Sequence, residues 1–96
     1  MFIHLGKDIA VPIKNIIAIF DLESTTTSKI TKEFLGVAQE EGFIENISED
    51  IPKSFIITEQ DKKSKIYLSH ISSVTLLKRA DFIKGINNSM DNIKLI

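Results

Sequence analysis

A run of hydroxyl side chains followed by two lysines is the segment of this chain best suited to binding a ligand. The hydroxyls occupy residues 24–28 (Ser-Thr-Thr-Thr-Ser), and the cations are Lys29 and Lys32. Free N–H groups at a helix start, neighbouring hydroxyls and lysines are the groups that a phosphate oxygen prefers. A simple helix cap with exposed lysines explains the same residues equally well. The segment therefore predicts either a phosphate contact or a structural cap.

Two other polar corners have residue types that could contact phosphate. Lys14 and Asn15 separate two apolar segments, and Lys53 follows Pro52 in a polar loop. We expect all three side chains to be exposed, although none is a specific signal by itself. Lys62, Lys63 and Lys65 form a further basic cluster, but charge at a hairpin tip more often serves solubility than binding.

Residues for catalysis or metal binding are sparse. The chain has no cysteine and only two histidines, His4 and His70, whereas a zinc site needs three or four ligands. The four glycines are scattered, so no phosphate-cradling loop and no nucleophile elbow is present. We interpret His4, in an apolar strand, as structural. The sequence predicts no enzyme, no catalytic residue, no metal, no cofactor and no small-molecule substrate.

Charge constrains the class of partner. The formal net charge of the 96 residues is -1, whereas a monomeric protein that binds nucleic acid is usually basic. Of the 12 lysines and arginines only Arg79 is an arginine, which is the commonest side chain for reading guanine. Base readout is therefore not expected. Phosphate contact by lysines stays open if the cations share one face or if many copies join.

Length and hydropathy favour a single soluble domain. Ninety-six residues are enough for one hydrophobic core. No apolar run approaches the roughly 20 residues that span a bilayer, and the N-terminal segment lacks the pattern of a signal peptide. We therefore expect a cytoplasmic protein with no membrane partner.

Periodicity predicts the elements that position these residues. Short apolar runs indicate strands over residues 2–5, 9–11, 16–20, 43–47, 54–58 and 65–69, the last two flanking a long solvated turn at 59–64. One helix should begin between Thr25 and Ser28 and end at Gly42, and a second should bury Leu76, Leu77 and Ala80. The order β-β-β-α-β-β-β-α predicts an α+β domain with a small, mainly antiparallel sheet over residues 1–84. The tail at 85–96 is expected to be flexible or to pack on a neighbouring subunit.

Two apolar patterns predict how their elements pack. In the first helix, apolar residues recur at i, i+4, i+7 and i+8 and predict one buried stripe, made of Ile30, Phe34, Val37 and Ala38. The continuous apolar run at 16–20 is typical of a strand that is covered on both faces. We expect another subunit to cover one of those faces.

Five segments in order resemble one known family. They are FIHLG (2–6), VPIKNIIAIFD (11–21), STTTSKITKEF (24–34), SEDIPKSFIIT (48–58) and IYLSHISSVTLLKR (66–79). Together they resemble the RemA/RemB family of extracellular-matrix regulators, and the RemB branch most closely, over about residues 1–80. The resemblance implies a small cytoplasmic bacterial protein with a fold related to the LytTR DNA-binding domain. It also implies closed rings of subunits that bind DNA and regulate transcription of biofilm matrix genes.

The chain departs from this family at the positions where the resemblance places DNA-contacting arginines. Those positions hold Asn15 and Ile51–Pro52, with lysine only beside them. Lysine does not reproduce the planar, bidentate guanidinium. One hypothesis is an oligomeric regulator that contacts the phosphates of double-stranded DNA through Lys14, Asn15, Lys29, Lys32 and Lys53. The alternative is a homo-oligomeric assembly module that binds a protein partner without DNA.

Overall fold

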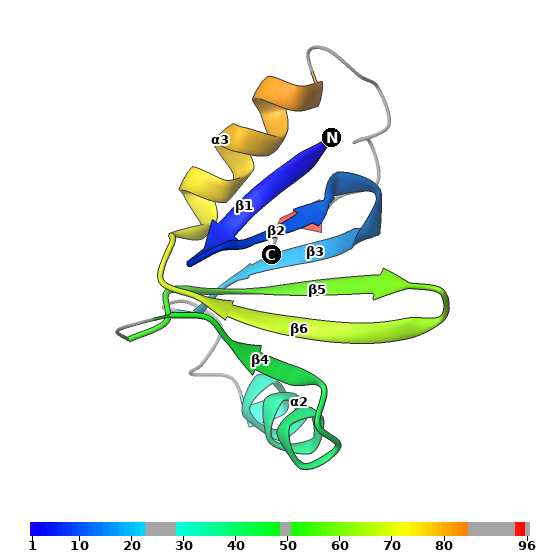
Figure 1. The fold of residues 1–96 in the computed structure, drawn as a ribbon. Coiled ribbons are helices and arrows are strands. Elements are labelled where there is room, and N and C mark those ends of the chain that lie inside the picture. The colour runs from blue at the N-terminus through cyan, green and yellow to red at the C-terminus, as the bar shows by residue number, and fades with distance from the viewer. Residues whose placement is uncertain (23–28, 49–50, 85–93, 96) are drawn as a thin grey trace.

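The computed structural model describes residues 1–22, 29–48, 51–84 and 94–95 (Figure 1). The elements in order are β1 (Phe2–Gly6), β2 (Ile9–Pro12), the 3-10 turn η1 (Ile13–Asn15), β3 (Ile16–Asp21), α2 (Lys29–Glu40), β4 (Ile44–Asn46), β5 (Ser54–Gln60), β6 (Lys63–Ser69), α3 (Ser73–Lys84) and β7 (Lys94–Leu95). This is the small α+β arrangement that the periodicity predicted, with one more strand at the C-terminus.

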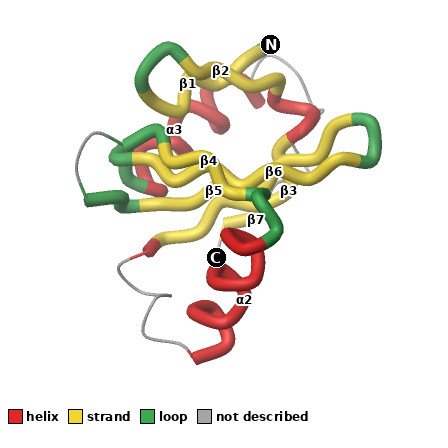
Figure 2. Tube along the Cα trace, turned by 60° about the horizontal axis from the view of Figure 1, so that its bottom comes forward, coloured by secondary structure: helices red, strands yellow, loops and turns green. Residues whose placement is uncertain are grey.

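The main sheet has five strands in the order β4-β6-β5-β3-β7. β5 pairs antiparallel with both β3 and β6, whereas β4 and β7 add parallel pairs at the two edges. β1 and β2 form a separate antiparallel hairpin. This hairpin and α3 lie on one side of the sheet, and α2 lies on the other (Figure 2).

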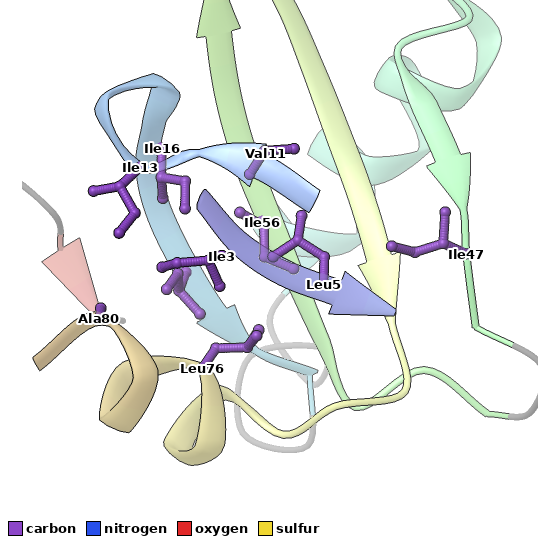
Figure 3. Packing of buried hydrophobic residues seen from close by; sticks show 10 residues of the cluster. Ile3, Leu5, Val11, Ile13, Ile16, Ile47, Ile56, Leu76 and Ala80 are labelled. Atoms are coloured by element: carbon purple, nitrogen blue, oxygen red, sulfur yellow. The ribbon is translucent and has the colours of Figure 1, made fainter. Parts of the chain in front are cut away.

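Alternation along β5 divides the apolar side chains between two cores. Ile56 joins the larger core, where it packs with residues of the hairpin, η1, β3 and α3 (Figure 3). Its neighbour Phe55 points to the opposite face, into a smaller core beneath α2 with Leu22, Ala38 and Ile66. The ring of Phe55 stacks on that of Phe20 with centroids 4.4 Å apart. Successive strand residues face opposite sides, so one strand supplies both cores.

The apolar run in β3 is covered by its own chain. Ile16, Ala18 and Ile19 are buried, and β3 has cores on both faces. Coverage of both faces was expected, and within the subunit α3 and the β1–β2 hairpin lie on one side of the sheet and α2 on the other. The expected contact of β3 with another subunit stays a prediction. Ile17 is 44% exposed because the pairing register shifts between Ile16 and Ala18.

The stripe expected on α2 is only partly buried. Ala38 is buried and Leu35 is half-buried, but Phe34 and Val37 are 45% and 59% exposed. The helix projects from the sheet, so only a narrow part of its surface meets the strands (Figure 2). The side chain of Ile30 and the expected start of the helix at Thr25–Ser28 lie outside the described residues. Gly42 has φ of +80°, which is the left-handed helix end that the sequence predicted.

The turn between β5 and β6 is much shorter than expected. The expected solvated turn at 59–64 is wrong, because Gln60 pairs with Lys63 and only Asp61 and Lys62 are left to connect the strands. Both have positive φ, 52° and 66°. Two left-handed residues are what a tight turn of type I′ needs to match the twist of its strands. Polar composition predicted a loop here, although these polar residues continue the strands.

The C-terminal tail contributes the two residues of β7. Lys94 and Leu95 pair in parallel with Ala18 and Ile19 of the same chain. The rest of the tail, residues 85–93 and 96, lies outside the described part of the chain. Among the described residues, no helix has the length and apolar character needed to cross a membrane.

Candidate functional site

The first candidate corner is η1, which links the β1–β2 hairpin to the main sheet. Lys14 is exposed there, and Asn15 is half-buried. Nδ2 of Asn15 donates a hydrogen bond of 3.3 Å to Oε1 of Gln60 at the end of β5. The amide of Asn15 is thus held against the β5–β6 hairpin, and Lys14 extends into solvent beside it.

The second corner is the segment that leads into β5. The backbone of Lys53 is fixed, since its N–H donates to the carbonyl of Ser69 (2.8 Å) and its carbonyl accepts from the N–H of Leu22 (3.0 Å). Its side chain is exposed. β3 and β5 pair from Ile16–Thr58 to Asp21–Ser54. Lys14 and Lys53 therefore lie at opposite ends of this strand pair, which is about 17 Å long at the usual rise per residue.

The third corner is the N-terminal part of α2. Lys29 and Lys32 are exposed and stand three residues apart, so they are neighbours on the helix surface. α2 itself projects away from the sheet (Figure 2). The hydroxyl run at 24–28 lies outside the described residues. The structure thus places the five predicted residues on three separate corners of one subunit.

An open cleft of about 520 Å³ lies next to the first corner. It is lined by β2, Asn15 and the β5–β6 hairpin, including Lys63, Lys65 and Tyr67. Nζ of Lys65 lies 2.6 Å from Oε1 of Glu45 and 5.4 Å from the centre of the Tyr67 ring. The hydrogen bond to Glu45 raises the pKa of Lys65 above its ordinary value. Lys65 therefore helps to join β6 to β4.

An apolar groove of about 350 Å³ separates α2 from the face of β5 and β6. It is lined by Phe34, Val37, Ala38, Phe43, Ile57, Ser64 and Ile66. Phe43 is 45% exposed, like Phe34. We call this surface the α2 groove. Sequence analysis missed it because it assigned Phe34 and Val37 to the interior, and helical spacing does not distinguish a core contact from an exposed apolar contact.

A second exposed apolar surface lies on the opposite side of the sheet. Met1 and Phe2 are 58% and 63% exposed at the start of β1, whereas Ile3 and Leu5 point into the core. We call Met1 and Phe2 the β1 patch. One subunit therefore presents two different apolar surfaces on opposite sides.

Arg79 and His4, two further residues that sequence analysis weighed, have structural contacts. Nη1 of Arg79 donates to the carbonyl of His4 (2.8 Å), and Nε2 of His4 lies 2.6 Å from the carbonyl oxygen of Lys7. In the described ranges, no three His, Asp or Glu residues come together in a way that could hold a metal ion.

Comparison with known proteins agrees with the segments that suggested a family. Residues 2–80 match the model of the RemA-like family, described as extracellular matrix regulatory protein A-like. Over 88 residues, the chain is 39% identical to Extracellular matrix regulatory protein B of Bacillus subtilis (strain 168), an alignment that covers 92% of this chain and all of that protein. The matched residues include β1 to β6 and most of α3. The chain therefore belongs to the RemA-like family, with a similarity to the protein B branch.

Proposed function

We propose that this protein is a homo-oligomeric regulator of extracellular matrix genes that contacts the phosphate backbone of DNA through basic corners repeated from subunit to subunit. The name of the Bacillus relative supports the regulatory role. The proposal includes closed rings of subunits and a fold related to that of the LytTR domain, as the family resemblance implies. It also assigns the protein to the cytoplasm and to binding rather than catalysis.

The observation that carries the proposal is the separation of the basic corners. Lys14 and Lys53 lie at opposite ends of the β3–β5 strand pair, and the Lys29–Lys32 pair lies at the start of α2, so these described lysines are not gathered on one element. Repetition in a ring would join weak contacts into a multivalent one, since linked sites raise affinity without new kinds of contact. The net charge of -1 is then compatible with phosphate binding, because the arrangement of the cations matters more than their sum.

Assembly is supported by the two exposed apolar surfaces. Apolar residues exposed together mark interaction sites in soluble proteins. The α2 groove and the β1 patch are formed by different residues, and α2 and β1 lie on opposite sides of the main sheet (Figure 1). A contact between two different surfaces repeats head to tail, and it closes into a ring when the rotation allows. We therefore propose that the β1 patch of one copy occupies the α2 groove of the next.

DNA binding is tested by titrating a mixed-sequence duplex with the protein at several salt concentrations. Phosphate contacts predict an affinity that falls steeply as salt rises and varies little with sequence. Lys29→Glu and Lys53→Glu should each weaken binding while leaving the assembly intact. Lys78→Glu is the matched control, since Lys78 is an exposed lysine of α3 outside the three corners. Equal binding by all three variants would contradict the assigned contacts.

The alternative function is an assembly module that binds a protein partner without DNA. It is favoured by Asn15 and Ile51–Pro52 at the positions where the resemblance places arginines. The same titration separates the two functions. An assembled protein that retains no duplex even at low salt would support the assembly module and overturn the DNA-binding proposal.

A further inference from the structure

The two edges of the main sheet differ in how readily another chain could pair with them. An exposed edge strand presents free N–H and C=O groups to which another chain can pair. At one edge, β4 has only three residues, and its central Glu45 is held by Lys65. A short, charged strand is a poor template for such pairing. At the other edge, the two-residue strand β7 borders β3, which has six residues and contains the uncharged run Ile-Ile-Ala-Ile-Phe at 16–20.

The run in β3 has the composition of an aggregation-prone strand. β-branched and aromatic residues without charge, proline or glycine pair readily with identical segments. β5 occupies one side of β3 along its length, from Ile16 to Asp21. The hydrogen-bonding groups on the other side of β3 are those next to β7.

β7 covers the middle of this edge. Lys94 and Leu95 pair with Ala18 and Ile19, which are 6% and 0% exposed. The pairing adds a strand of only two residues that contains a lysine. Short edge strands and edge lysines are devices by which proteins prevent edge-to-edge association. β7 lies beyond residue 80, where the match to the family ends.

We propose that the outer edge of β3 is a strand-acceptor site, that β7 of the same chain occupies it, and that β7 thereby prevents the β3 edge of a second copy from pairing there. The competing occupant is a second copy because the run at 16–20 is complementary to itself. Two β3 strands related by a two-fold axis run antiparallel. Such a pairing would join two four-stranded sheets, each β4-β6-β5-β3 without β7, into one continuous sheet. This site is separate from the α2 groove and the β1 patch.

The test compares the full-length chain with a chain that lacks residues 94–96. Light scattering after size exclusion measures the mass, and amide hydrogen exchange measures protection in residues 16–21. The proposal predicts that truncation produces a species of about twice the full-length mass, as expected for a two-fold pairing. A peptide with the sequence of residues 91–96 should reverse the doubling. The same peptide with proline at positions 94 and 95 should not, because proline cannot donate to a strand ladder.

Full-length variants keep the test decisive if the truncated chain does not fold. Lys94→Pro with Leu95→Pro removes both N–H donors of β7, whereas Lys94→Ala with Leu95→Ala keeps them. The proline pair should double the mass, and the alanine pair should not. An unchanged mass and unchanged exchange in residues 16–21 for the proline pair would overturn the proposal. Equal association of both pairs would also overturn it, because backbone pairing would then not be the cause.

Discussion

Nη1 of Arg79 donates a hydrogen bond to the carbonyl oxygen of His4, 2.8 Å away, and so joins α3 to β1 across 75 residues of sequence. Arg79 is the only arginine in the sequence, and the residue is exposed. A residue whose type favours reading a base therefore has a structural contact in the subunit. Its guanidinium helps hold the β1–β2 hairpin and α3 together on one side of the sheet.

Replacing Arg79 by methionine should lower the free energy of unfolding by about 1 kcal/mol, because the hydrogen bond to the carbonyl of His4 is lost. Urea denaturation followed by circular dichroism measures the change. Lys78→Met is the control, since it removes the same charge from the neighbouring exposed residue of α3. Equal stability of the two variants would show that charge, not the bond to β1, explains any loss.

Ser69→Ala should destabilise the protein by about 1–3 kcal/mol, the cost of leaving a buried polar group without its partner. Ser69 is fully buried, and its hydroxyl donates to the carbonyl of Leu5 and accepts from the N–H of Ile71. The loss would loosen the junction between β1, β6 and the segment before α3. Thermal unfolding is the measurement, with the exposed Ser64→Ala as the control. A melting temperature equal to that of the control would exclude this role.

Lys62→Gly should stabilise the β5–β6 hairpin by about 0.5–1 kcal/mol, because glycine adopts the left-handed conformation without the steric cost that a side chain carries. Lys62 has φ of 66°, and Asp-Gly is a preferred sequence for this turn type. Chemical denaturation of Lys62→Gly and Lys62→Ala separates the effect of backbone strain from the effect of the lost charge. Alanine removes the charge but keeps the strain, so a gain shared by both variants would contradict the conformational explanation.

The ion pair between Lys65 and Glu45 should stabilise the fold only while Lys65 is protonated. The hydrogen bond to Glu45 raises the pKa of Lys65 above its ordinary value of 10.5. The contribution is therefore complete below the unfolded pKa and is lost as pH rises through the higher, folded pKa. Both side chains are partly exposed, so the effect at neutral pH should be about 0.5 kcal/mol or less. Glu45→Gln should be less stable than the parent at pH 8, and the difference should vanish in strongly alkaline solution. A difference that persists there would contradict an ionic cause.

Head-to-tail assembly can be tested by mixing two variants. Phe34→Asp alters the α2 groove and Phe2→Asp alters the β1 patch, and because both residues are exposed, neither change opens a cavity in a core. Each variant alone should fail to assemble. Their mixture should form a dimer and nothing larger, because one intact groove and one intact patch remain.

Light scattering of the same mixture also distinguishes head-to-tail assembly from assembly around a two-fold axis. If groove meets groove around a two-fold axis, Phe2→Asp alone still associates, and adding Phe34→Asp gives no new species. Val74→Asp is a matched control, since Val74 is an exposed apolar residue of α3 outside both surfaces. Loss of assembly in this control would show that the effect is not specific to the proposed contact.

Much of the fold could be predicted from sequence because its signals are local. Strand alternation, the helix end at Gly42 and the hydroxyl of Ser72, which accepts from the N–H of Thr75 at the start of α3, each depend on residues within a few positions. The burial of Leu76 and Ala80 followed from helical spacing, whereas Leu77, which was expected to be buried with them, is half-buried. The exposure of Lys14, Lys29, Lys32 and Lys53 followed from their charge.

The sequence by itself determined the order of the elements and most of the inward-facing residues, because both depend on periodicity and turn chemistry over short stretches. Only the tertiary structure decided that Phe34 and Val37 are exposed, that β7 pairs with β3, and that Lys14 and Lys53 lie at opposite ends of the β3–β5 pair. Apolar spacing predicts that one face of a helix packs against another apolar surface, but it does not identify that surface. The partner surface depends on how distant elements pack, and among the described side chains of α2 it is Leu35 and Ala38 that join the core.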